Sequence, residues 1–421
     1  MKNFLSGFPT LDKLKKEVQG LSFPPYREAN SHIHTPFSFS AFSDMQTIFR
    51  MATEEKIALL GINDFYVSDG YNEFHKGCIE NRIFPLFNIE FIGLLKEEQQ
   101  KGIRINDPNN PGRIYFSGKG LDYPFHSGWL QKRKLKKVIM ESQVQIRAMI
   151  VKLNRLIQQN NPSLSLSYES VKKRYAHDLV RERHLAKAIR NLAVESFNSP
   201  DDQLLFLETL YGGKKSKTDI SNSAALENEI RANLLKSGGA AFVEEDEKSF
   251  LELKKIIKII IAAGGIPCYP VLLDDPSGKY TEFEKDNEKL LASLNKLGIE
   301  CIELIPGRND YNILKNFVEF FHNKGFIITF GTEHNTPEMI PLSVTARGSV
   351  PLDESLKRIA WEGACVIAAH QYLRADGRQG YVLPDGTHSN DQKHELIKLG
   401  QLVIEYYLNK PLYEAGNKRP D

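Results

Sequence analysis

The chain carries Asn30-Ser31-His32-Ile33-His34-Thr35 and, further on, Gly61-Ile62-Asn63-Asp64-Phe65 and Asn88-Ile89-Glu90, three segments that decide its fold. In a β-strand, residues two apart project to the same side, so we expect the imidazoles of His32 and His34 to point together. Each segment is a short apolar run that ends in a polar residue of a kind that binds metal ions. A parallel α/β barrel presents its active site in this way.

Two imidazoles on one face of a strand make half of a divalent-metal site, and a carboxylate from a neighbouring strand can complete it. The alternative is that the His-x-His pattern is a chance arrangement with no metal, because such a short motif occurs often. The order of the three segments, each ending in a ligand-type residue, favours the metal.

The composition excludes several classes of protein. The 421 residues carry 26% charged side chains and a net charge of only +2, so bulk charge does not indicate a nucleic-acid binder. The four cysteines show no C-x-x-C spacing, which favours buried thiols in a reducing compartment. The apolar part of the N-terminus is too short for a signal peptide, and no apolar run approaches the length of a bilayer span. We therefore expect a soluble, cytoplasmic protein with no membrane partner.

Helices and strands alternate along most of the chain, which predicts a parallel sheet in an α/β fold. Residues 1–29 are predicted to form an N-terminal extension. A barrel is expected over residues 30–345, interrupted at about 129–247 by a block that is helical almost throughout. Residues 346–421 are predicted to add an apolar strand at 363–370, which ends in His370, and helices packed on the barrel, the last over 391–408.

The chain resembles the PHP (polymerase and histidinol phosphatase) family. The similarity runs through His32 to Ser38, Ala52 to Asp64, Asp69 to Phe74 and Phe84 to Glu90, and continues through Arg181 to Ala186, Ala263 to Ile266, Gly298 to Glu303 and Gly331 to His334. It implies a distorted (β/α)7 TIM-like barrel that binds up to three ions of manganese, zinc or iron. It also implies hydrolysis of phosphate esters, either in small molecules or at nucleic-acid ends.

This sequence departs from the family pattern at several ligand positions. Phe65 stands where the family has a His, and Tyr115 and Tyr269 stand where it has two more. The closing Gly-Ser-Asp-x-His becomes Gly331-Thr332-Glu333-His334, with a longer acid and a His one place early. Phenylalanine cannot bind a metal, and a tyrosine with a pKa near 10 is a poor ligand unless the ion removes its proton.

The resemblance therefore implies one well-formed site for a divalent ion, with a second site at most weak. Its predicted ligands are His32, His34, Glu90 and Glu333. Asp64 is predicted to orient a metal-bound water or to act as general base. His184 and His334 are the other candidates for proton transfer, although a His behind an Arg in a helix is usually a pairing residue. Arg308 and Lys119 are candidate phosphate clamps.

Three functions are compatible with this pattern. The first is a metal-dependent hydrolase, most specifically a phosphoesterase that uses a metal-activated water. The second is a barrel that kept the fold, lost hydrolysis and serves as a binding or regulatory module. The third is a metal-dependent lyase or isomerase acting on sugars, which the fold alone does not exclude.

Overall fold

The computed structural model describes residues 4–17, 22–177, 179–388 and 392–409. Its centre is one sheet rolled into a nearly closed barrel, with the strand order β1-β2-β3-β4-β6-β7-β8. The strands are β1 (Ala29–Ile33), β2 (Leu59–Phe65), β3 (Phe84–Leu94), β4 (Arg113–Lys119), β6 (Ile266–Val271), β7 (Cys301–Leu304) and β8 (Ile327–Phe330). The predicted TIM-like barrel is thus confirmed. The sheet is parallel except at β4, which is antiparallel to both of its neighbours.

The barrel closes where the end of β8 meets β1. The Glu333 amide donates to the His32 carbonyl at 2.9 Å, and the His34 amide donates to the Glu333 carbonyl at 2.7 Å. Gly331 permits this approach, because a Cβ at that position would lie 2.3 Å from the Cβ of His32. The closure places the loop after β8 directly beside the His-x-His segment.

Helices cover the outside of the barrel, as the alternating pattern predicts. They are α2 (Met45–Glu54), α3 (Tyr71–Asn81), α10 (Leu253–Ala262), α11 (Asn287–Leu297) and α12 (Tyr311–Asn323), with the short α4 (Lys96–Gln100) at one edge. α2 shows how the sequence specifies them: Asp44 caps its first turn, and its apolar residues Met45, Ile48, Phe49 and Ala52 are buried. The short strand β5 (Leu251–Glu252) extends the sheet beside β3.

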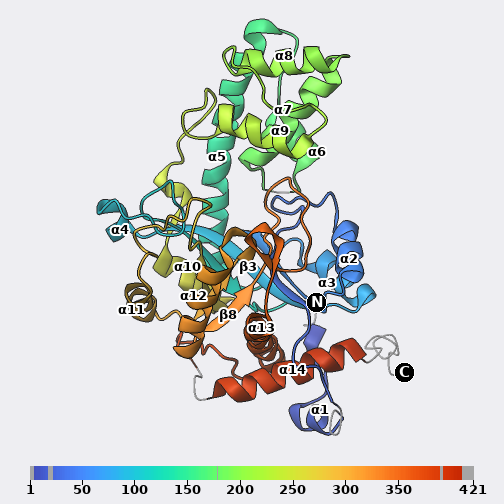
Figure 1. Cartoon of the computed structure of the whole chain (residues 1–421), viewed down its shortest axis with the longest axis vertical. Helices are drawn as coiled ribbons and strands as arrows, with labels where there is room; N and C mark the ends of the chain where they lie inside the picture. Colours follow the sequence, from blue (N-terminus) through green and yellow to red (C-terminus); the bar gives the residue numbers. More distant parts are fainter. Residues whose placement is uncertain (1–3, 18–21, 178, 389–391, 410–421) are drawn as a thin grey trace.

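A helical insertion leaves the barrel after β4 and returns at α10. It contains α5 (Gly128–Asn160), α6 (Tyr168–Tyr175), α7 (Glu182–Ser196), α8 (Pro200–Leu210), α9 (Ser223–Ile230) and a π-helical turn at Arg231–Leu235. These helices share an apolar core of their own and project from one end of the barrel (Figure 1). None of the described helices has the length and apolar character that a membrane span requires.

The C-terminal part corrects one prediction. Residues 363–370, expected as a strand, lie within the long helix α13 (Glu354–Ala375). A short run that is apolar on all sides fits a buried strand and a buried helix equally well. Here Asp353 caps the helix start, and the run packs against β8 and α14 (Lys393–Asn409). Asp391, where the last helix was expected to begin, lies outside the described residues.

Smaller elements complete the chain. α1 (Leu11–Glu17) and a 3-10 turn at Phe4–Gly7 precede the barrel, and β9 (Thr345–Ala346) pairs with β10 (Val350–Pro351). α1 and α14 lie together at the end of the barrel opposite the insertion (Figure 1).

Candidate metal centre

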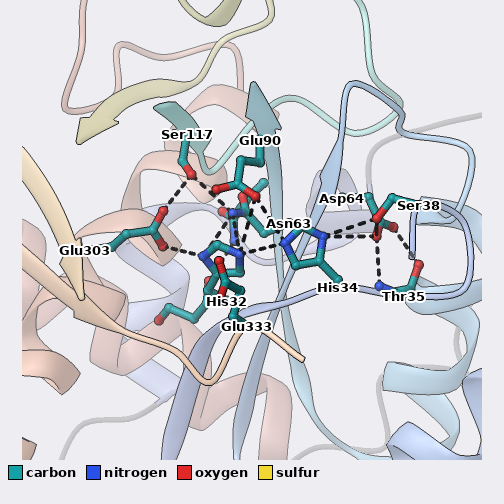
Figure 2. Close-up of polar contacts among 12 residues, drawn as sticks. His32, His34, Thr35, Ser38, Asn63, Asp64, Glu90, Ser117, Glu303 and Glu333 are labelled. Atoms are coloured by element: carbon teal, nitrogen blue, oxygen red, sulfur yellow. Dashed lines mark hydrogen bonds and ion pairs between the residues drawn. The ribbon is translucent and has the colours of Figure 1, made fainter. Parts of the chain in front are cut away.

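His32 and His34 project from β1 and the residue after it, with both rings buried. Their Nε2 atoms face each other at 3.3 Å (Figure 2). Two imidazole nitrogens at this separation leave no room for a proton on each. The arrangement suits two neutral rings that offer lone pairs to a shared cation.

Glu90 and Glu333 join the two histidines. Glu90, near the middle of β3, places its Oε2 atom 3.1 Å from His34 Nε2 and 4.0 Å from His32 Nε2. One ligand atom from each of the residues His32, His34, Glu90 and Glu333 lies within 4.8 Å of all the others. The structure therefore brings together the four residues that the sequence predicted as metal ligands.

The chemistry of this cluster fits a divalent ion. Glu90 Oε2 is buried and accepts no hydrogen bond within the described part of the chain. Burial raises the pKa of the Glu90 carboxyl to about 7 and lowers the pKa of the His34 imidazole well below its usual value. A buried carboxylate without a hydrogen bond is costly, and a cation held between it and the imidazoles would remove that cost.

Glu333 is held at the pocket by an unusual backbone. Both Glu333 and His334 have positive φ angles, 67° and 54°, in the left-handed region that non-glycine residues seldom adopt. The pairing of this loop with β1 holds that conformation. Such strain persists only where the surroundings enforce it, and it is common at functional sites. Here it directs the Glu333 carboxylate toward Arg308, with which it forms an ion pair.

Glu303 on β7 is a residue of this site that the sequence did not indicate. Its Oε2 atom lies 2.9 Å from His32 Nδ1, and its Oε1 atom accepts from Ser117 Oγ at 2.6 Å (Figure 2). Asn63 Nδ2 lies against the same imidazole, 3.0 Å from Nε2. A carboxylate behind a metal-binding imidazole fixes the tautomer and orientation of the ring. The available signal was an acidic residue within the otherwise apolar strand Cys301-Ile302-Glu303-Leu304.

Asp64 lies behind His34 and outside the four-residue cluster. Its carboxylate accepts from the Thr35 amide at 2.8 Å, the Thr35 hydroxyl at 2.5 Å and the Ser38 hydroxyl at 2.7 Å. The same Ser38 hydroxyl lies 3.2 Å from His34 Nδ1. Burial, opposed by these hydrogen bonds, raises the pKa of Asp64 to about 6. The contacts connect Asp64 to the His34 ring.

The structure does not bring His184 or His334 into the cluster. His334 contacts the Thr332 hydroxyl through Nδ1 at 2.8 Å and the Ile340 carbonyl through Nε2 at 2.9 Å. His184 Nδ1 accepts from the Arg181 amide at 2.9 Å, at the start of α7. Both rings therefore have structural contacts.

The three substituted positions differ in where they point. Phe65 stacks on His34, with the ring centroids 4.7 Å apart. Tyr115 lines the pocket above the cluster. Tyr269 is fully buried on the outer side of β6, where its hydroxyl donates to Glu284 at 2.6 Å. Tyr269, which stands where the family has a ligand histidine, thus packs behind the sheet and does not point into the cluster.

The cluster lies at the floor of a pocket of about 270 Å³ at the end of the barrel that faces the insertion. Tyr115, Arg308 and Asn335 line it from the barrel, and Arg183 lines it from α7 of the insertion. Burial lowers the pKa of the Arg183 guanidinium to about 10, so this side chain keeps its charge at neutral pH. Two guanidinium groups beside the cluster suit an anionic ligand.

The fold of the barrel agrees with the TIM-like barrel that the resemblance in the sequence implies. No family model matches the sequence, and no curated protein matches it either. Among solved structures, the chain is similar to a protein from Bifidobacterium adolescentis provisionally named a metal-dependent phosphoesterase. The TM-score is 0.52 and the identity 12%, over 80% of this chain and 96% of that one.

An amidohydrolase from Chromobacterium violaceum, solved with bound sulfate and no metal, gives a TM-score of 0.48 and 14% identity over 76% of this chain and 93% of that one. At 12% identity, the likeness to the Bifidobacterium adolescentis structure establishes the fold and not the activity.

Proposed function

We propose that this protein is a metal-dependent hydrolase of phosphate esters. The observation that carries the proposal is the convergence of four buried ligand atoms, from His32, His34, Glu90 and Glu333, at the floor of a pocket flanked by two arginines. A divalent ion bound there would lower the pKa of a coordinated water and neutralise the charge that forms on attack. Two imidazoles and two carboxylates suit manganese, zinc or iron.

The residues of the chain supply orientation and charge. Glu303 holds the His32 ring with Nε2 toward the cluster, and Asp64 supports His34 through Ser38. We therefore assign Asp64 a positioning role. Arg183 and Arg308 would bind the oxygens of a phosphoryl group, since a guanidinium matches that geometry.

The size of the pocket favours a small substrate. A volume of about 270 Å³ accommodates a phosphoryl group with a modest organic part. A phosphorylated nucleic-acid end is the second substrate class that the resemblance implies, and only its terminal phosphate would have to enter the pocket. The experiment below compares the two classes.

Two other functions are less well supported. A non-catalytic barrel would have no need for a buried carboxylate without a hydrogen bond, and the Glu90 oxygen is such a group. A lyase or isomerase needs an acid–base residue open to the substrate. Asp64 and His334, the residues considered for that role, have their polar atoms occupied by Thr35, Ser38, Thr332 and Ile340.

The test combines metal analysis with an activity screen. We expect purified protein to hold one equivalent of transition metal and to hydrolyse a small phosphate monoester such as p-nitrophenyl phosphate faster than a 5′-phosphorylated oligonucleotide. His32→Ala should lose the metal and reduce the rate at least about a hundredfold. His394→Ala, at an exposed position on α14, is the matched control and should change neither. Protein that binds no metal and hydrolyses neither substrate after reconstitution would refute the proposal.

A further inference from the structure

Lys119 is a charged side chain enclosed inside the barrel, with no exposed surface. It lies at the end of β4, two residues beyond Ser117, which pairs with Glu90 on β3. Because β4 is antiparallel to its neighbours, the Lys119 side chain enters the barrel from the end opposite the pocket. Its Nζ atom lies 2.5 Å from Glu303 Oε2. An enclosed ammonium is tolerated only when it is paired, and Glu303 provides that pairing.

Glu303 is fully engaged as a result. Its Oε2 atom contacts both Lys119 and His32 Nδ1, and its Oε1 atom accepts from Ser117. The Glu303 carboxylate therefore already has a cationic partner within the chain, and Lys119 contacts the same oxygen that contacts His32.

We propose that Lys119 takes the place of a second metal ion and restricts this site to one divalent cation. The inference rests on the proposed metal site. A second divalent ion in the cluster would need a buried carboxylate beyond Glu90 and Glu333. Glu303 is the one that adjoins His32, and it already holds a cation. An ammonium is a compact, strongly hydrated charge that cannot dissociate from the chain, so it fills this position in every molecule.

The experiment counts manganese ions. Wild-type protein and Lys119→Ala are loaded with excess Mn²⁺, desalted, and examined by elemental analysis and by electron paramagnetic resonance. We expect one equivalent in the wild type, with the hyperfine spectrum of isolated Mn²⁺. Lys119→Ala exposes the Glu303 carboxylate and should take up a second equivalent, with a spectrum broadened by coupling between two ions.

Two variants control for indirect effects. Lys119→Ala combined with Glu303→Gln removes both charges and should return the count to one. Lys76→Ala, whose side chain is 77% exposed on α3, should match the wild type. A merely structural role for Lys119 would change stability in these variants without changing the count of ions.

The outcomes separate this inference from the proposed function. Wild-type protein that binds two equivalents with a coupled spectrum overturns the inference and leaves the hydrolase proposal standing. Wild-type protein that binds none refutes the hydrolase proposal. A folded Lys119→Ala variant that still binds one equivalent also overturns the inference. If that variant does not fold, Lys119→Met, which removes the charge and keeps most of the side-chain volume, takes its place, and a folded Lys119→Met variant that binds one equivalent also overturns the inference.

Discussion

At the scale of single residues, the site depends on how burial changes the protonation of a few groups. His32 and His34 are enclosed, and burial lowers the pKa of each imidazole, which favours the neutral ring with one nitrogen that can bind an ion. Glu90 shifts the other way, toward its protonated form. Burial thus favours the metal-binding forms of His32 and His34 and disfavours the metal-binding, deprotonated form of Glu90.

Glu90 is the residue through which pH should act on metal binding. Because its pKa is about 7 and a ligand must be deprotonated, the apparent affinity for Mn²⁺ should fall about tenfold for each pH unit below 7. The measurement is a competition titration against a chelating dye between pH 5.5 and 8.5. Glu90→Gln should bind more weakly and flatten the profile. An affinity independent of pH in the wild type would contradict the assignment.

The same shift predicts the stability of the metal-free protein. A raised folded-state pKa means that the contribution of Glu90 is fully present below its unfolded value of about 4.5 and is lost as pH rises through about 7. The gap in melting temperature between metal-loaded and metal-free protein should therefore widen across that range.

At the scale of elements, the long helix α13 forms the base of the barrel. Gly363 lies so close to β8 that a Cβ there would be 2.0 Å from the Ile328 carbonyl oxygen. On α14, a Cβ at Gly400 would be 1.8 Å from the Cys365 carbonyl oxygen. Contacts this close explain why glycines occur inside two helices, where glycine otherwise lowers helix stability.

Gly363→Ala should therefore destabilise the protein although alanine favours helix. The added methyl must displace backbone of β8, and overpacking of this kind costs about 1–3 kcal/mol. Denaturant unfolding measures the change. Gly7→Ala, at a position with nothing within 4 Å of the added Cβ, is the control and should be nearly neutral. Equal stability of Gly363→Ala and the wild type would contradict the packing of α13 against β8.

At the scale of the whole molecule, the insertion and the barrel form one pocket. The insertion has its own apolar core, yet α7 places Arg183 in the pocket that contains Glu90 and Glu333. The barrel supplies the cluster of ligand atoms, and the insertion supplies part of the wall that faces it. Substrate size and charge should therefore depend on both.

Arg183→Ala tests whether the insertion contributes to substrate binding. Removing one guanidinium that contacts the substrate should weaken substrate binding by about 1.5–3 kcal/mol, which corresponds to a rise in KM of about ten- to a hundredfold. The metal content should not change, because Arg183 is not among the four clustered residues. The exposed Arg155 of α5 provides the control variant. A KM equal to that of the wild type would contradict a role of the insertion in substrate binding.

The sequence alone determined the class of fold and indicated the candidate ligands. The resemblance to the PHP family implied His32, His34, Glu90 and Glu333, and the barrel brings one ligand atom of each within 4.8 Å of the others. The helix at 363–370 could not be predicted, because its run is apolar on every side and only the barrel base and α14 distinguish helix from strand there.

Only the tertiary structure revealed the role of Glu303 and the placement of Asp64, Tyr269 and the remaining histidines. It also showed that Lys119, predicted as a phosphate clamp, pairs with Glu303 and does not line the pocket. Each of these depends on which side chains from distant strands meet in space. Local periodicity tells which face of a strand a residue occupies, but not that the ammonium of Lys119 on β4 reaches the carboxylate of Glu303 on β7. Lys119 and Glu303 lie far apart in the sequence, and their side chains meet only because the sheet rolls into a barrel.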